Sequence, residues 1–142
     1  ISVDELENWL QEICTKLRHT LHHERRDSTV RLTEQAKAYI REHYKENDLS
    51  ADSLCRHLNV SAAYFSTIFK REVGMSFVAY LTQVRLEHAV ELLRTTEDKT
   101  YIIASQVGYT EPNYFSYVFK KQYGISPSRY RANMVSQEQK AE

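Results

Sequence analysis

The feature that most constrains the fold is a segment that occurs twice, fifty residues apart. Residues 63–71 read Ala-Tyr-Phe-Ser-Thr-Ile-Phe-Lys-Arg, and residues 113–121 read Asn-Tyr-Phe-Ser-Tyr-Val-Phe-Lys-Lys. Between positions 64 and 80, eight of 17 residues are identical at this offset. They are Tyr64, Phe65, Ser66, Phe69, Lys70, Gly74, Ser76 and Tyr80. Two copies are too few for a solenoid, so the repeat predicts a duplicated supersecondary unit.

Each copy has a helical pattern with two different faces. Apolar residues at helical spacing predict a buried stripe in each copy: Phe65, Ile68, Phe69 and Val73, then Phe115, Val118, Phe119 and Tyr123. The opposite stripes end in a lysine and are otherwise small or hydrogen-bonding: Ala63, Ser66, Thr67 and Lys70, then Asn113, Ser116, Tyr117 and Lys120. Short donors and acceptors suit base edges and cations suit phosphates, whereas a solvated face would more often mix Glu and Lys.

A short helix and a turn precede each copy. Residues 51–58 predict a helix capped by Ser50, and Ser61 can cap the next helix, at 62–72. Residues 101–107 predict the equivalent helix of copy two, and Pro112 suits the first turn of the helix at 112–122. Glu111 is an added residue in the second turn. Two helices joined by a turn of three or four residues form a helix-turn-helix, and we expect two of them, at about 50–74 and 100–124.

From about Leu32 to Met134 the chain resembles the DNA-binding domain of AraC/XylS-type bacterial transcription activators. The most specific part of the resemblance is the stretch 107–121, followed by 124–131. Copy one departs from the family at Cys55, where Ala is usual, and at Asn59, where Gly is common. Neither departure threatens the fold, because Cys is small and apolar and Asn tolerates left-handed backbone angles. The resemblance implies double-stranded DNA and RNA polymerase as partners, and an upstream sensory or receiver domain. The layout looks most like the response-regulator branch.

The predicted fold is all-α, with about seven helices forming two helix-turn-helix subdomains joined by a long central helix. Residues 77–94, capped by Ser76, are apolar almost all round, which predicts a helix packed by a subdomain at each end. Eighteen residues give about 27 Å, close to one turn of DNA at about 34 Å. We place a connector helix at 1–29, the AraC-type domain at 30–135 and a disordered tail at 136–142.

The first 26 residues predict one helix with an apolar seam, Leu6, Leu10, Ile13 and Leu17, spaced four, three and four apart. The seam resembles a coiled coil or interdomain connector, through which the chain could form homodimers. The alternative is an amphipathic helix packed on its own domain, since fewer heptads are present than a sustained coil needs. Residues 27–29, Asp-Ser-Thr, indicate a break before a second helix at about 30–45 that braces the first helix-turn-helix.

The charge distribution supports nucleic-acid binding although the net charge is zero, with 19 basic and 19 acidic residues. From residue 112 to 135 the chain has four cations, Lys120, Lys121, Arg129 and Arg131, and no acid. Overall neutrality implies weak non-specific binding to DNA.

Several other functions find little support in the sequence. His19, His22, His23 and Glu24 include an i,i+4 histidine pair, but without a Cys-rich or carboxylate framework nearby we expect no metal site. No phosphate-binding glycine loop or nucleophile motif is present, so we expect neither an enzyme nor a cofactor. No apolar run is long enough for a membrane span, no signal peptide is visible, and two Cys fit a reducing, cytoplasmic compartment. The chain begins at Ile rather than Met, as a fragment of a longer protein would.

The candidate DNA-binding residues follow from the two polar stripes. Those expected at base edges are Ala63, Ser66, Thr67, Asn113, Ser116 and Tyr117. Those expected at the phosphate backbone are Ser61, Lys70, Arg71, Lys120, Lys121, Ser126, Arg129 and Arg131. For Arg85 we favour an ion pair with a neighbouring carboxylate, and for Arg94 an ion pair and a phosphate contact are both open. The rival function is a helical protein-interaction module, in which the outer stripes would be apolar.

Overall fold

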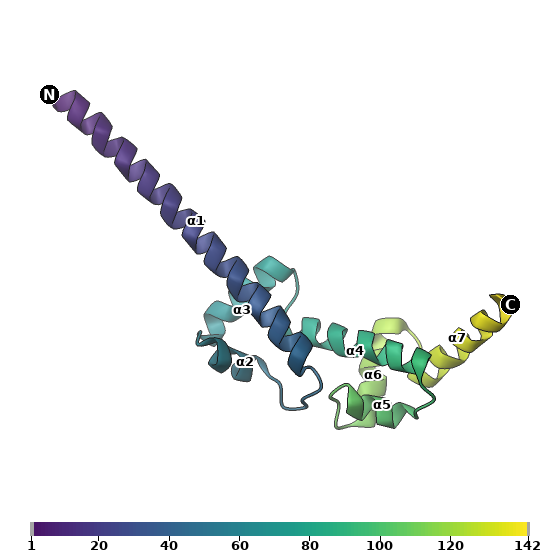
Figure 1. Cartoon of the computed structure of the whole chain (residues 1–142). Coiled ribbons are helices and arrows are strands. Elements are labelled where there is room, and N and C mark those ends of the chain that lie inside the picture. Colours follow the sequence, from purple (N-terminus) through teal and green to yellow (C-terminus); the bar gives the residue numbers. More distant parts are fainter. Residues whose placement is uncertain (1, 142) are drawn as a thin grey trace.

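The computed structural model describes residues 2–141, except for the side chains of residues 21–25 and 141. Seven α-helices and no strands are found in this part of the chain. They are α1 (Val3–His43), α2 (Ala51–Leu58), α3 (Ala62–Val73), α4 (Phe77–Thr95), α5 (Thr100–Gln106), α6 (Pro112–Tyr123) and α7 (Pro127–Ala141). In Figure 1, α1 projects from one end as a long rod, α4 runs through the body, and α7 leaves the other end. The all-α prediction, with two helix-turn-helices joined by a long helix, is confirmed.

The first helix is continuous, so the predicted break at 27–29 is wrong. Helix α1 runs through this stretch without interruption for 41 residues. The Thr29 hydroxyl donates to the Arg26 carbonyl at 2.9 Å, and the Thr33 hydroxyl to the Thr29 carbonyl at 2.8 Å. Because these hydroxyls bond back to carbonyls of the preceding turn, they stay within the helix instead of capping a new one. The predicted connector and brace helices are therefore one rod of about 60 Å.

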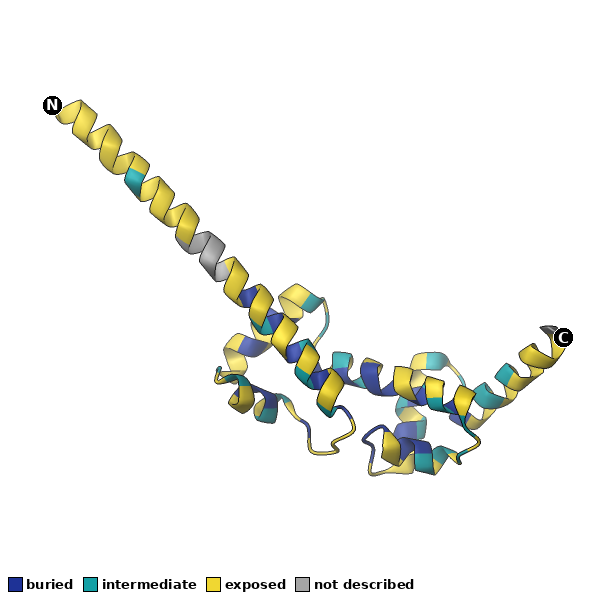
Figure 2. Ribbon diagram, in the orientation of Figure 1, coloured by how far each residue is buried: buried dark blue, intermediate teal, exposed yellow. Residues whose placement is uncertain are grey.

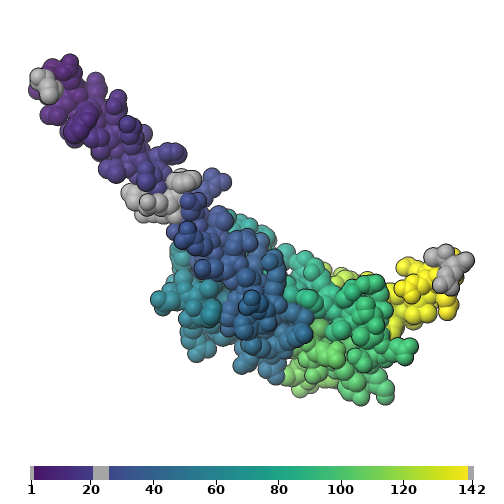
Figure 3. Space-filling model, viewed as in Figure 1, coloured from purple at the N-terminus to yellow at the C-terminus, as the bar shows by residue number. Residues whose placement is uncertain are grey.

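The two ends of α1 differ in burial. Near its C-terminus, Ala36 and Ile40 are fully buried against the helices that follow. Toward the N-terminus, Leu6, Leu10 and Leu17 are 49%, 48% and 57% exposed. Figures 2 and 3 show this segment standing clear of the body of the molecule. The alternative in which the N-terminal seam packs on its own domain is therefore wrong for the described side chains.

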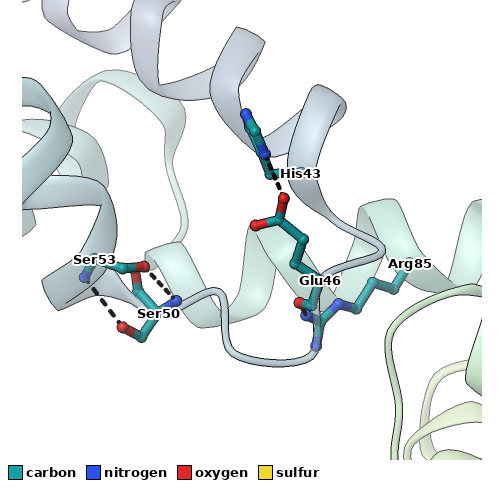
Figure 4. A network of polar contacts seen from close by, with 5 residues as sticks. All are labelled: His43, Glu46, Ser50, Ser53 and Arg85. Carbon is teal, nitrogen blue, oxygen red and sulfur yellow. Dashed lines mark hydrogen bonds and ion pairs between the residues drawn. The ribbon is translucent and has the colours of Figure 1, made fainter.

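The first helix-turn-helix consists of α2 and α3 and begins with reciprocal caps. Ser50 and Ser53 form a capping box at the start of α2, drawn in Figure 4, and Ser61 accepts from the Tyr64 N–H at the start of α3. Asn59 ends α2 with φ 58° and ψ 48°, the left-handed conformation that Asn tolerates. The structure thus contains both predicted serine caps, Ser50 and Ser61.

The second helix-turn-helix, α5 and α6, repeats the packing of the first. The Phe69 ring meets Tyr80 edge-on at 5.6 Å between centroids, and the equivalent pair Phe119 and Tyr130 does so at 5.5 Å. Phe65 and Phe115 occupy the same place in the two copies, and at most 1% of either side chain is exposed. The duplication in sequence is thus a duplication of structure: α3 packs toward the start of α4 as α6 packs toward α7.

Helix α4 belongs to both copies. Its buried residues, which spread over more than one face of the helix, are Phe77, Leu81, Val84, Arg85, Leu86, Ala89 and Leu93. The apolar ones join the core of both helix-turn-helices, so one continuous cluster reaches from Ala36 on α1 to Phe119 on α6. Not every apolar residue of the predicted central helix is buried, since Val78 is 66% exposed.

Residues 136–141 are helical, contrary to the disordered tail predicted at 136–142, and Glu142 lies outside the described residues. Helix α7 continues to Ala141. Ser126 opens it by accepting from the Arg129 N–H at 3.3 Å. The tail residues Gln, Glu, Lys and Ala are good helix formers, and they extend a helix already nucleated where Pro127 packs into the core.

Within the described chain, no helix combines the length and apolarity needed to cross a membrane. The described side chains also contain no cluster of three or more potential metal ligands. His22, His23 and Glu24, considered above as ligands with His19, lie outside the described side chains.

Gly108 offers a test of how the two helix-turn-helices meet. A Cβ at Gly108 (φ +102°) would lie 2.5 Å from the Tyr44 carbonyl oxygen and 2.9 Å from Arg85 Nε, whereas one at Gly74 (φ +86°) would meet nothing within 4 Å. Both alanine variants carry the penalty of positive φ, about 1–2 kcal/mol, and only Gly108→Ala adds overpacking of about 1–3 kcal/mol. Urea denaturation should therefore show a clearly larger loss for Gly108→Ala. Equal losses would mean that the contact seen at Gly108 is not tight.

Candidate DNA-binding surface

The second helix of each pair presents a polar face opposite its buried phenylalanines. On α3, the side chains of Ala63, Ser66 and Thr67 are exposed. On α6, Asn113 and Tyr117 are exposed and Ser116 is half-buried. The six predicted base-edge residues therefore form two surfaces, each on one helix, at opposite ends of α4 (Figure 1).

The chemistry of the two surfaces differs. The Thr67 hydroxyl donates to the Ala63 carbonyl at 3.0 Å, which leaves Thr67 with its methyl group and an acceptor. Ala63 adds only a methyl group, and Ser66 a hydroxyl. Helix α6 presents a carboxamide on Asn113 and a phenol on Tyr117, which is 62% exposed. Helix α6 therefore offers more hydrogen-bonding groups than α3 does.

Cations lie at the ends of both helices. Lys70 on α3 and Lys120 and Lys121 on α6 are exposed in the last turns. Arg71 pairs with Glu72 at 3.2 Å. An exposed pair of this kind contributes at most about 1 kcal/mol, so Arg71 can exchange its partner for a phosphate at little cost.

Two helix N-termini add hydrogen-bond donors. Ser61 and Ser126 accept backbone N–H groups at 3.2 Å and 3.3 Å as the N-caps of α3 and α7. Because each serine oxygen acts as an acceptor in these bonds, its hydroxyl proton can still be donated, and the N-terminal end of a helix favours an anion. Arg129 lies exposed in the first turn of α7.

Arg131 departs from its predicted role. Its guanidinium donates to three backbone carbonyls: Leu93 at 3.1 Å, Thr96 at 3.2 Å and Asp98 at 2.6 Å. These carbonyls end α4 and begin the link to α5, so Arg131 caps the C-terminus of α4, where a cation also interacts favourably with the helix dipole. With these donors in use, Arg131 is a structural residue and not a free cation for phosphate.

Arg85 does not make the ion pair that we favoured. It is 8% exposed, and it donates to the Tyr44 carbonyl at 2.9 Å and to the Glu46 carbonyl at 2.8 Å. Its guanidinium also lies over the Tyr109 ring, 5.2 Å from the centroid. Burial lowers the pKa of Arg85 and raises that of Tyr109, and the contact between the two residues opposes both shifts. The signal in the sequence was a cation placed between two apolar residues of the central helix, Val84 and Leu86.

Arg94, by contrast, is exposed and pairs with Glu91 on its own helix, with 2.5 Å between the contacting atoms. Of the two interpretations that the sequence left open for Arg94, the structure shows the ion pair.

Two tandem helix-turn-helices, in which the second helix of each (α3 and α6, the recognition helices) carries an exposed polar face, define a DNA-binding protein of the helix-turn-helix class. Residues 54–133, more than half of the chain, match the family described as "Helix-turn-helix domain". The C-terminal domain of AraT, a response regulator from Geobacillus stearothermophilus, is 43% identical with a TM-score of 0.71, covering 72% of this chain and 84% of that one. The DNA-binding domain of AdpA, solved with a target DNA, is 25% identical with a TM-score of 0.70, covering 74% and 94%.

Among curated relatives, the raffinose operon transcriptional regulatory protein RafR of Pediococcus pentosaceus is 39% identical over 108 residues, 74% of this chain and 39% of that protein. The arabinose operon regulatory protein of Escherichia coli is 30% identical over 132 residues, 93% of this chain and 44% of that protein. The chain belongs to the AraC/XylS family of transcription regulators and carries its DNA-binding domain. It spans less than half the length of these two relatives.

The structural role of Arg131 can be tested against its neighbour Arg129. Arg131→Gln removes three charge-assisted hydrogen bonds and leaves half-buried carbonyls without their donor, so it should lower the free energy of unfolding by about 1–3 kcal/mol. Arg129→Gln makes the same charge change at an exposed position and should leave stability within about 0.5 kcal/mol. Urea denaturation of both variants measures the difference. If the two unfold at the same urea concentration, Arg131 is not a structural cap.

Proposed function

We propose that this chain binds double-stranded DNA in a sequence-specific manner, as the output domain of a bacterial transcription regulator. Its recognition helices, α3 and α6, enter two adjacent segments of the major groove. The observation that carries this proposal is the pair of polar recognition faces held at opposite ends of one rigid helix, α4. The similar AdpA domain, solved with its target DNA, supports it. Action on chromosomal DNA would place the protein in the bacterial cytoplasm.

We assign base contacts to Ala63, Ser66 and Thr67 in one groove segment and to Asn113, Ser116 and Tyr117 in the other. Asn113 is the strongest candidate, because an exposed carboxamide in the first turn of a recognition helix can pair with adenine through two hydrogen bonds. Ser116 is half-buried and reaches less far than its neighbours. The segment read by α6 should therefore show the stronger sequence preference.

We assign phosphate contacts to the exposed cations Lys70, Arg71, Lys120, Lys121 and Arg129, and to the helix N-termini at Ser61 and Ser126. These groups lie near the ends of the recognition helices, where the DNA backbone borders the groove. Arg131 is omitted because three backbone carbonyls at the end of α4 already bind its guanidinium.

A single chain should read an asymmetric site. Helix α4 has 19 residues, which is about 28 Å, close to the pitch of one DNA turn at about 34 Å. Because both helix-turn-helices pack on α4, their separation is fixed, and no palindrome is required for one chain to bind.

Asn113 and Lys120 on α6 separate base recognition from phosphate binding. After selection of a preferred site from random DNA, Asn113→Ala should relax preference at one or two base pairs, a loss of about 1–3 kcal/mol of discrimination. Lys120→Gln is the matched control. It should weaken binding to all DNA sequences alike, and it should reduce the slope of log binding constant against log salt concentration by about one. Binding titrations on matched and mismatched duplexes at several salt concentrations measure both effects. An unchanged preference in Asn113→Ala removes Asn113 from base readout.

We further propose that the chain forms homodimers through the exposed part of α1. Val3, Leu10 and Leu17 lie seven residues apart, as do Leu6 and Ile13, so they occupy the a and d positions of a heptad repeat. All but the half-buried Ile13 are exposed in the monomer. A second copy of the same helix is the partner that this spacing fits. By its likeness to the AraT domain, the intact protein would be a response regulator with a receiver domain before α1.

The dimer can be tested at Leu10. Leu10→Glu places a charge in the seam and should weaken self-association tenfold or more, since burial of one leucine contributes about 1.5–3 kcal/mol. Gln11→Glu makes the same charge change beside the seam and serves as the control. Sedimentation equilibrium over a wide range of protein concentration gives both association constants. A wild-type chain that stays monomeric at the highest concentrations, or an equal effect of the two changes, contradicts a dimer through this seam.

Regulation of transcription would also bring the chain into contact with RNA polymerase, which we propose as a second macromolecular partner. The alternative function, a helical protein-interaction module, is disfavoured by the recognition faces. An interaction module would present large apolar residues there, whereas α3 presents small or hydrogen-bonding ones, Ala63, Ser66 and Thr67.

A further inference from the structure

Arg85 lies between the end of α1, which packs on the first helix-turn-helix, and the turn of the second helix-turn-helix. It is the only charged side chain among the buried residues of the described structure. Its two carbonyl acceptors, Tyr44 and Glu46, belong to the end of α1 and the loop that leads into the first helix-turn-helix. Figure 4 shows the second of these contacts, with Arg85 reaching from α4 to the Glu46 backbone while the Glu46 side chain turns back to His43.

The other side of Arg85 faces the second helix-turn-helix. Its guanidinium lies over the ring of Tyr109, in the turn between α5 and α6. The preceding residue, Gly108, is so close that a Cβ there would lie 2.9 Å from Arg85 Nε and 2.5 Å from the Tyr44 carbonyl oxygen. The end of α1, which packs on the first helix-turn-helix, therefore meets the second helix-turn-helix directly at this point, with Arg85 beside the contact.

Next to this contact the two parts are separated by solvent. A crevice of about 550 Å³ is lined by residues 45–48 on the first side and by residues between Tyr101 and Thr110 on the second. Beside the crevice, the contacts of Arg85 join the end of α1 to the second helix-turn-helix. The hydrogen bonds and the ring contact of Arg85 are thus well placed to control their relative orientation.

The contacts of the buried guanidinium are better suited to fixing the orientation of the packed segments than to stabilising the fold. Burying a cation without a carboxylate partner carries a desolvation cost, which the two neutral carbonyls and the Tyr109 ring only offset. A guanidinium is planar and holds its donors in a fixed fork, so it defines directions that an apolar side chain would leave free. Apolar surfaces can slide past one another, whereas two hydrogen bonds and a stacked ring cannot without being broken.

We propose that Arg85 is a positioning residue for DNA binding: it fixes the angle and separation of α3 and α6 by tying the end of α1, on which the first helix-turn-helix packs, and the turn of the second helix-turn-helix to the middle of α4. This inference rests on the proposed reading of two adjacent groove segments. It assigns the fixed spacing between those segments to the side chain of Arg85 in addition to the length of α4. Arg85 itself contacts no DNA in this account.

The first measurement needs no DNA. In the full chain carrying Cys14→Ser and Cys55→Ala, spin labels at Arg56→Cys on α2 and Gln106→Cys on α5 report the distance between the two helix-turn-helices. With Arg85 present, the distance distribution should be narrow. Arg85→Met, which keeps the apolar stem and loses the donors, should broaden or shift it. Arg85→Lys, which keeps the charge and loses the fork, should give an intermediate width.

Arg94→Met is the matched control, because it removes an exposed arginine from the same helix and should leave the distribution unchanged. Circular dichroism establishes that each variant has kept its helices. If Arg85→Met does not fold, the distance distribution of Arg85→Lys alone tests the proposal. A folded variant with the wild-type distribution overturns the proposal.

The second measurement uses the selected DNA site and the same site with five base pairs inserted between its two segments. The insertion turns the second segment to the opposite face of the DNA, so the wild-type chain should lose affinity on the order of tenfold or more. Arg85→Met should bind the original site more weakly and lose less than about threefold on insertion, because its second helix-turn-helix is no longer oriented. A change that only lowered stability would leave the penalty for insertion intact.

The two measurements separate failure of this inference from failure of the proposed function. A wild-type chain that binds no DNA site selectively contradicts the proposed function, while the label distances still decide the role of Arg85. A variant that keeps the full insertion penalty contradicts the positioning role while two-segment recognition stands.

Discussion

The structure depends on the burial of helix α4 by two partners at once. Its apolar residues cover more than one face, so it cannot be satisfied by packing on a single neighbour. At the start of α4, Phe77 packs against the aromatic rings of α3. Toward the end of α4, Ala89 and Leu93 join the core of the second helix-turn-helix. Because a single core runs through α4, the two helix-turn-helices are held as one body and are not two domains on a flexible linker.

The duplicated unit explains how this sharing arises. Each helix-turn-helix is braced from behind by one helix and followed by another, with α1 and α4 in these places for the first copy and α4 and α7 for the second. In each copy, an arginine from the helix that follows the helix-turn-helix binds carbonyls at the C-terminal end of the helix that precedes it. Arg85 on α4 does this for α1, and Arg131 on α7 does it for α4. The two arginines are not at equivalent positions of the repeat, so this shared solution is a property of the packing and not of the duplicated sequence. Only Arg85 also reaches the neighbouring helix-turn-helix, which gives it a second role.

The continuity of α1 has a functional consequence. Its C-terminal half packs on α2 and α3, and its N-terminal half carries the exposed seam, so both lie on one helix without a break. A dimer formed at the seam would therefore be joined stiffly to the first helix-turn-helix. It would favour one arrangement of the two copies on DNA, in contrast to a flexible linker, which would allow many.

The sequence by itself determined the local structure and the division of each recognition helix into a core face and a polar face. Helical periodicity, the capping serines at 50, 61, 76 and 126, and the repeat of fifty residues each depend on neighbours within a few turns, and all of these features are present in the structure. The base-edge candidates and the lysines could be selected in the same way, because a residue opposite a buried phenylalanine on a helix must face outward.

Only the tertiary structure decided what depends on partners far along the chain. Arg85 and Arg131 bind carbonyls 39–41 and 33–38 residues away. No spacing rule identifies such acceptors, so an ion pair and a phosphate contact were the local expectations. The residues at 27–29 have the composition of a helix start, yet packing of the surrounding helix and back-bonding of the threonine hydroxyls keep them helical. Sequence periodicity therefore specified the faces of the helices, and the long-range carbonyl contacts of two arginines determined how those helices are fixed to one another.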